Sequence, residues 1–95
     1  MPWIHATLSA RVDDVNGLAR ELARAAATSA GLEPTDVVVL VTIADASAGS
    51  GAVVTVSGRR RDNRVEADLI DSLRQVVASC TGLNVDLVAV VRYST

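Results

Sequence analysis

The chain has 95 residues, 49% of them apolar, and a formal net charge of −2 at pH 7, which predicts one folded domain and excludes disorder. The slightly negative charge argues against a general nucleic-acid binder, and the single cysteine, Cys80, excludes an intrachain disulfide and a zinc cluster. No apolar run approaches the roughly 20 residues that a membrane span needs, and no signal-peptide pattern opens the chain, so we expect a cytoplasmic protein.

The first half of the chain predicts a strand, a helix and a second strand. Residues 2–9 alternate between apolar and other side chains, which is typical of a half-buried strand. A helix follows, with Asp13 or Asp14 as its N-cap and with Gly31 suited to the left-handed position that ends it. Residues 36–44 are an almost continuous β-branched run, which predicts a strand covered on both faces.

The second half predicts the same elements again. Residues 52–57 form a short, Val-rich strand, and a helix then starts with Asn63 as its N-cap and Glu66 close to a capping box. The apolar stripe of this helix includes Cys80, which we therefore expect in the core. Residues 85–93 form the last strand, so the predicted order is β-α-β-β-α-β.

The two halves also resemble each other in sequence, since Ala30-Gly31-Leu32 matches Thr81-Gly82-Leu83 at the same point of each half. We predict a single domain, residues 1–95, built from two β-α-β units at about 2–44 and 52–93. Right-handed crossovers give a four-stranded sheet with both helices on one face, an α/β (α+β) fold. The other face of the sheet is apolar and bare, so we predict an oligomer.

The chain resembles the tautomerase superfamily in three stretches. These are the opening Met1-Pro2-Trp3-Ile4-His5, the segment 30–36 before the second strand, and the segment 56–69 that contains the arginines. The length of two units is similar to the macrophage migration inhibitory factor and cis-3-chloroacrylic acid dehalogenase branches. The resemblance implies a trimer in which three sheets form a barrel, and an activity that needs no cofactor and no metal.

Pro2 is the catalytic residue that the resemblance implies. If Met1 is removed, the prolyl nitrogen is a free secondary amine, and desolvation and nearby cations both disfavour its protonated form. Arg61 and Arg64 match two arginines, three residues apart, with which the dehalogenase branch binds a substrate carboxylate. Arg11 lies near the place where single-unit members have a further arginine after the first strand.

The implied function is that of a cofactor-free tautomerase or isomerase, which moves a proton on a small 2-oxo or enol carboxylic acid. Ala89 and Val91 stand where the migration-inhibitory-factor branch has a tyrosine and an asparagine, and the sequence reaches Thr95 without the water-activating glutamate of the dehalogenase branch. We therefore expect keto–enol proton transfer rather than hydration or dehalogenation. The expected partners are a small anionic substrate and further copies of the chain, in a trimer, without nucleic acid or membrane.

Two other interpretations remain open at this stage. A retained Met1 would make the Pro2 nitrogen a tertiary amide, and the protein would then have a tautomerase fold without tautomerase activity. The order β-α-β-β-α-β is also that of ferredoxin-like folds, including ACT-type regulatory domains. Residues 14–18 are loosely similar to the effector-binding turn of those domains, although its proline is missing. A dimer favours the regulatory module, and a trimer favours the tautomerase.

Overall fold

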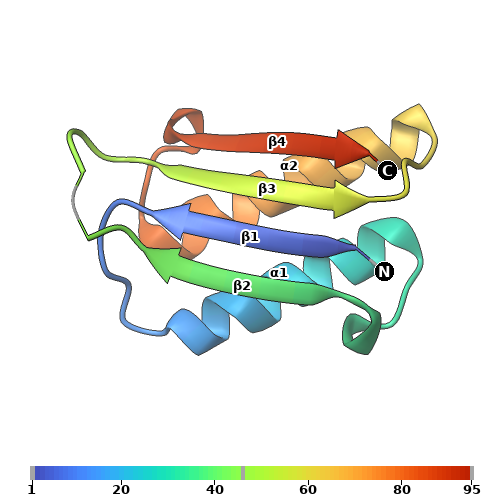
Figure 1. The fold of residues 1–95 in the computed structure, drawn as a ribbon, viewed down its shortest axis with the longest axis horizontal. Coiled ribbons are helices and arrows are strands. Elements are labelled where there is room, and N and C mark those ends of the chain that lie inside the picture. Colours follow the sequence, from blue (N-terminus) through green and yellow to red (C-terminus); the bar gives the residue numbers. More distant parts are fainter. Residues whose placement is uncertain (1, 46, 95) are drawn as a thin grey trace.

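A computed structural model describes residues 2–45 and 47–94 of the chain (Figure 1). The strands are β1 (Trp3–Leu8), β2 (Val38–Ile43), β3 (Ala52–Gly58) and β4 (Val88–Ser94). The helices are α1 (Val15–Ala30) and α2 (Asn63–Thr81), and short 3-10 turns, Pro34–Asp36 and Val85–Leu87, precede β2 and β4. Both helices lie on the same face of one sheet, as the sequence predicted.

The order of the strands in the sheet is β2-β1-β3-β4, and it follows from the two β-α-β units. β1 and β2 are parallel neighbours, β3 and β4 are parallel neighbours, and β1 and β3 meet antiparallel at the centre. A ferredoxin-like sheet splits each β-α-β unit by inserting another strand between its two strands. The strands of each unit are adjacent in this chain, so the ferredoxin-like interpretation is wrong.

The antiparallel centre gives the sheet two different ends (Figure 1). At one end of the sheet, β1 and β2 start and β3 and β4 finish, and we call this the Pro2 end. We call the opposite end of the sheet the loop end, because residues 44–51 connect β2 to β3 there.

Side-chain caps determine where both helices begin. The Asp14 carboxylate accepts an N–H of the first turn of α1 at 2.8 Å, which confirms one of the two predicted caps. Helix α2 is capped by Asp62, whose carboxylate accepts the N–H of Val65 at 3.0 Å. The prediction of Asn63 is therefore wrong by one residue, because the carboxylate before it reaches the free N–H groups. Gly31 ends α1 in the left-handed conformation, as predicted.

The core lies between the sheet and the two helices. Helix α2 contributes Leu69, Leu73 and Val77, a row in which each residue is four positions after the previous one. The next member of that row is Thr81, whose hydroxyl donates to the Val77 carbonyl at 2.6 Å. Cys80 falls beside this row and is exposed, so its predicted place in the core is wrong.

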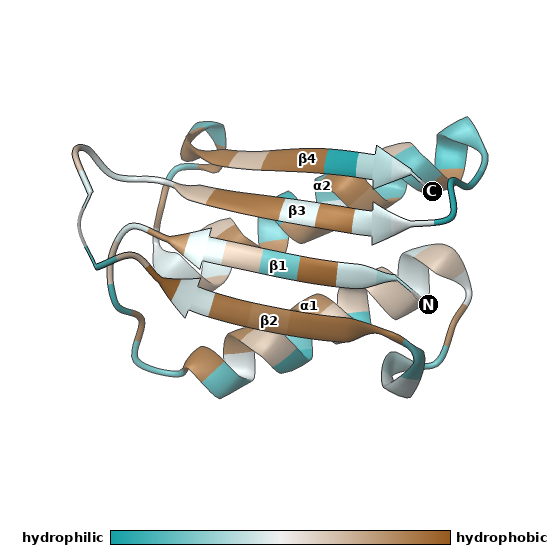
Figure 2. Cartoon of the chain, viewed as in Figure 1, coloured by the Kyte–Doolittle hydropathy of each residue, from teal (hydrophilic) through white to brown (hydrophobic). Residues whose placement is uncertain are grey.

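Figure 2 shows that β2 consists mainly of apolar residues and that β3 and β4 contain many. The face of the sheet that no helix covers carries several exposed apolar side chains. Leu40 on β2 is 52% exposed and Val53 on β3 is 46% exposed. The prediction that β2 is covered on both faces is wrong for the single chain, because β2 is an edge strand with only one face on the helices. Within residues 2–45 and 47–94, no helix is long and apolar enough to span a membrane.

Candidate active site

A cavity of about 400 Å³ lies at the Pro2 end of the sheet. Its lining comprises Pro2, Leu32, Asp36, Arg59 and Arg61. These residues meet because three connections converge on this edge: the entry to β1, the passage from α1 to β2, and the exit from β3.

Pro2 is buried and directly precedes β1. Its carbonyl accepts the N–H of Val38 at 3.1 Å, so the residue continues the β1–β2 ladder and its position is set by the sheet. Pro2 contributes to the wall of the cavity. Met1, whose removal would free the prolyl nitrogen, lies outside the described residues.

Two arginines reach this cavity from the segment after β3. Gly58 ends the strand with φ 138°, a conformation that favours glycine, and residues 59–62, without regular secondary structure, lead to α2. Arg59 and Arg61 both line the cavity. Arg64 lies in the first turn of α2, is exposed, and is not part of the lining. The predicted pair is thus brought to Pro2 only in part, with Arg59 beside Arg61.

Arg11 lies far from Pro2 within one chain. It lies three residues after the end of β1, and the six residues of that strand, at about 3.3 Å each, separate Arg11 from Pro2 by roughly 20 Å. At the loop end Arg11 lines a separate small hollow together with Ser9 and Thr81.

Asp36 is a lining residue that the sequence interpretation did not single out. Its carboxylate accepts the N–H of Glu33 at 3.4 Å, which ties it to the short turn before β2. The cavity therefore holds one carboxylate opposite two guanidinium groups. A carboxylate near an amine favours the protonated form of the amine, whereas guanidinium groups favour the neutral form.

A buried ion pair between Glu66 and Arg92 holds the backbone of residues 58–61, which we call the arginine segment. Arg92 Nε donates to Glu66 Oε2 at 2.8 Å, and the two side chains are 9% and 6% exposed. The Arg92 guanidinium also donates to the carbonyl oxygens of Arg59, at 2.8 Å, and Gly58, at 3.2 Å. Glu66 Oε1 accepts the N–H of Arg61 at 2.8 Å. One ion pair therefore fixes the backbone that carries both arginines of the cavity.

Burial alone raises the pKa of the Glu66 carboxyl. The hydrogen bonds from Arg92 and from the Arg61 N–H, together with the charge of Arg92, outweigh burial and hold the pKa below its usual value of 4.5. The alternation of β4 is the signal that could have identified this pair. Val88 and Val90 face the helices, so Arg92 has the same orientation and needs a buried acidic partner.

Because the pKa of Glu66 is lower in the folded chain, its ionised form stabilises the fold above pH 4.5, and this contribution is lost as the pH falls through the lowered value. We expect the free energy of unfolding to fall more steeply with acid in the wild type than in Glu66→Gln. Urea unfolding between pH 3 and pH 7 measures this. Asp68→Asn, at an exposed position of the same helix, is the matched control. Equal slopes for the wild type and Glu66→Gln would contradict the lowered pKa.

His5 lies away from the cavity, on the open face of the sheet. Its Nε2 is 3.0 Å from the hydroxyl of Thr42, which is 3.3 Å from that of Thr7. Across the described parts of the chain, no group of three or more His, Cys, Asp or Glu residues is arranged to hold a metal ion.

Solved structures with this fold cover nearly the whole chain. A fused 4-OT, described as a symmetric trimer, has a TM-score of 0.88 at 20% identity, covering 98% of this chain and 85% of its own. A macrophage migration inhibitory factor-like protein from Entamoeba histolytica has a TM-score of 0.86 at 13% identity, covering 99% and 88%. Pt0534, inactivated by 2-oxo-3-pentynoate, has a TM-score of 0.81 at 18% identity, covering 99% and 84%.

The chain therefore has the fold of the tautomerase superfamily, as the resemblance in sequence implied. At these identities the likeness shows the fold alone. No family model matches the sequence, and no curated protein matches it.

Proposed function

We propose that the protein is a cofactor-free tautomerase acting on a small 2-oxo or enol carboxylic acid. The observation that carries the proposal is the position of Pro2, buried at the start of β1 in the wall of a cavity of about 400 Å³ that also holds Arg59 and Arg61. Guanidinium groups bind carboxylates through paired, charge-assisted hydrogen bonds. The cavity thus combines a candidate proton carrier with groups suited to an anionic substrate.

The proposed reaction moves one proton and breaks no bond between heavy atoms. The neutral amine of Pro2, after removal of Met1, takes the proton from the enol oxygen, and the resulting enolate carries the negative charge. The protonated Pro2 then delivers the proton to the carbon next to the one that bears this oxygen, which gives the 2-oxo acid and restores the free amine. Arg59 and Arg61 hold the carboxylate and stabilise the developing enolate charge.

We also propose that the protein is a homo-oligomer, with three copies as the preferred number. The bare apolar face of the sheet supports association, and the similar fused 4-OT is a trimer. Association would also give Arg11 a role, since this residue cannot reach the Pro2 of its own chain. The cytoplasmic location and the absence of nucleic-acid and membrane partners remain predictions.

The test begins with the state of the amino terminus. Intact mass shows whether Met1 is absent, and turnover of phenylpyruvate enol, followed by its absorbance, reports tautomerisation. Incubation with 2-oxo-3-pentynoate, which inactivates the similar Pt0534, should then add one reagent mass to the peptide that starts at Pro2 and abolish turnover. Retained Met1, or turnover that persists after complete labelling of that peptide, would overturn the proposal and favour a tautomerase fold without this activity.

Arg61→Ala should raise KM for an enol acid by about tenfold to a hundredfold, because a charge-assisted hydrogen bond contributes roughly 1.5–3 kcal/mol. Arg64→Ala is the matched control, because Arg64 belongs to the same cationic stretch but does not line the cavity. Steady-state kinetics of the two variants measure the difference. An equal rise of KM in both variants would mean that the arginines act through overall charge rather than through contact.

A further inference from the structure

The cavity at the Pro2 end has charges of opposite sign on the two sides of Pro2. Strand β1, which Pro2 directly precedes, lies between β2 and β3 (Figure 1). Neighbouring strands are about 4.8 Å apart, so β2 and β3 are roughly 10 Å apart across Pro2. Asp36 comes just before β2, and Arg59 and Arg61 come just after β3. The carboxylate therefore borders the cavity on one side of Pro2 and the two guanidinium groups border it on the other.

These opposite charges do not pair with each other. In the part of the chain that the structure describes, the ion pairs join Arg20 to Asp14, Arg24 to Glu21 and Arg92 to Glu66. Asp36 is held instead by its own turn, in which its carboxylate accepts the Glu33 N–H at 3.4 Å and its N–H donates to the Glu33 carbonyl at 2.9 Å. The Arg61 guanidinium donates to the Arg59 carbonyl at 3.2 Å. Both sides of the cavity are thus fixed separately, with space for a ligand between them.

Charged residues outside the lining follow the same division. Glu33 is exposed beside Asp36 and adds a second carboxylate to that side. Arg60 and Arg64 are exposed on the side of the arginine segment, where Asp62 is the one nearby carboxylate without a buried partner among the described residues. The difference in charge between the two sides is therefore larger than the lining alone provides.

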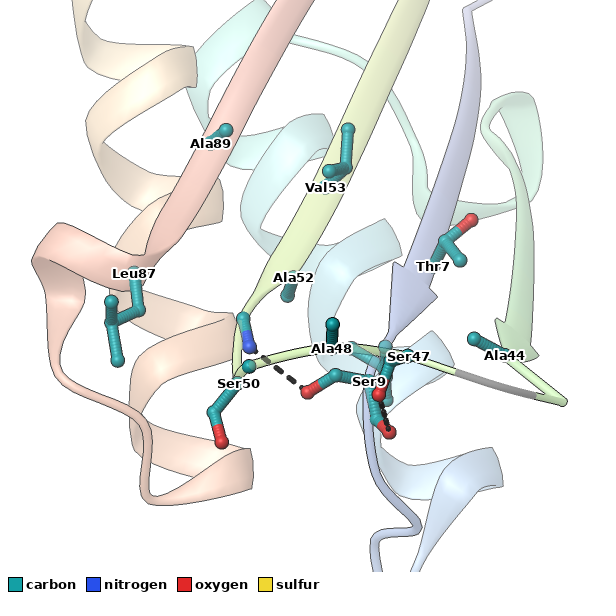
Figure 3. Close-up of a pocket in the computed structure, with 13 residues that line it drawn as sticks. Thr7, Ser9, Ala44, Ser47, Ala48, Ser50, Ala52, Val53, Leu87 and Ala89 are labelled. Carbon is teal, nitrogen blue, oxygen red and sulfur yellow. Dashed lines mark hydrogen bonds between the residues drawn. The ribbon is translucent and has the colours of Figure 1, made fainter.

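A second large hollow, at the loop end, lacks this division of charge. Its volume is about 350 Å³, and none of the described residues that line it is ionisable. Figure 3 shows Val53, Leu87 and Ala89 in its walls, together with small residues of the loop between β2 and β3. This hollow offers a carboxylate no charged partner. Selection among acids by charge therefore concerns the cavity at the Pro2 end.

We propose that Asp36 restricts the substrate to acids that carry a single carboxylate. The inference rests on the proposed function, in which Arg59 and Arg61 bind the substrate carboxylate and Pro2 moves the proton. A substrate bound in this way has its carboxylate on the arginine side and its reacting carbon at Pro2, so its far end extends toward Asp36. A second carboxylate at the far end meets a like charge, whereas a neutral group does not. Asp36 thus acts by repelling the wrong acid.

Three enol acids test this selection: phenylpyruvate enol and its derivatives with a carboxylate or a carboxamide at the para position of the ring. The carboxamide has nearly the size of the carboxylate without its charge. For the wild type, kcat/KM should be at least about tenfold higher for the carboxamide than for the diacid, and this ratio should fall as salt is added. Asp36 is exposed, so water and salt weaken the repulsion and a much larger ratio is not expected.

Asp36→Asn removes the charge and keeps an oxygen that can accept the Glu33 N–H, so the ratio of carboxamide to diacid should fall close to one. Any effect of Asp36 on the amine of Pro2 acts on both substrates and cancels in the ratio. Glu33→Gln neutralises the neighbouring exposed carboxylate, which does not line the cavity, and should keep the wild-type ratio. A wild-type ratio near one, no fall in Asp36→Asn, or an equal fall in Glu33→Gln would each overturn the selection by Asp36.

Binding without turnover distinguishes this inference from the proposed function. The saturated phenylpropanoates with a para carboxylate or a para carboxamide cannot tautomerise, and calorimetric titration measures their affinities. If the wild type prefers the carboxamide at least about tenfold in binding but turns over none of the enols, the proposed function fails and the selection by Asp36 stands. Turnover of the carboxamide and the diacid with equal kcat/KM retains the function and overturns the selection. A wild type that binds neither propanoate and turns over none of the enols overturns both.

Discussion

Pro2→Ala should lower kcat/KM for an enol acid by about 10²–10⁴, the range that a positioned acid–base group contributes. The substitution replaces the cyclic secondary amine by the primary amine of alanine, which no ring holds in one orientation, and leaves Arg59 and Arg61 in place. Binding of the carboxylate should therefore survive, and most of the loss should appear in kcat. The expected loss corresponds to roughly 2.7–5.5 kcal/mol of transition-state stabilisation.

Steady-state kinetics on wild type and Pro2→Ala, with intact masses that establish the first residue of each, measure this loss. The carbonyl of residue 2 pairs with the N–H of Val38, and alanine retains that hydrogen bond, so thermal unfolding should change little. Arg64→Ala, which alters an exposed residue outside the cavity, serves as the kinetic control. Equal kcat values for wild type and Pro2→Ala would exclude the proline as the proton carrier.

The fold could be predicted from the sequence because its determinants are local. Alternation in residues 2–9, the cap Asp14 and the closing Gly31 each act within a few residues of the chain. The internal repeat then requires two β-α-β units, and the right-handed crossover determines the side on which the helices lie.

The candidate site could be predicted only in part, because its lining depends on local backbone shape. A spacing of three residues suggested Arg61 and Arg64, but α2 begins at Asn63, so Arg61 precedes the helix and Arg64 lies in its first turn. In the segment before the helix, the residue that lines the cavity together with Arg61 is Arg59, two positions away. Asp36 enters the cavity only because β2 starts beside β1, and a pairing of strands is a non-local contact.

The ion pair of Glu66 and Arg92 shows a further limit, since its partners are 26 residues apart and belong to different elements. Arg92→Met should lower the free energy of unfolding by about 3–5 kcal/mol, because it leaves the Glu66 carboxylate buried without its main partner. Glu66→Leu should have a similar effect on the buried guanidinium. Domains of this size have only about 5–15 kcal/mol in total, so each loss is a large part of the stability.

The double variant Glu66→Leu/Arg92→Met distinguishes the contribution of the ion pair to the stability of the fold from its role in positioning Arg59 and Arg61. An apolar pair of similar volume can replace a buried ion pair with little cost, so the double variant should lose less than the sum of the single losses, and urea unfolding of all four proteins gives the coupling energy. The double variant still lacks the hydrogen bond that the Arg61 N–H donates to Glu66 and those that Arg92 donates to the carbonyls of Gly58 and Arg59. In the double variant, KM for an enol acid should therefore be higher than in the wild type, although much of the free energy of unfolding is recovered. Additive losses would show that the two side chains act separately, and a normal KM in the double variant would show that the arginine segment holds its shape without them.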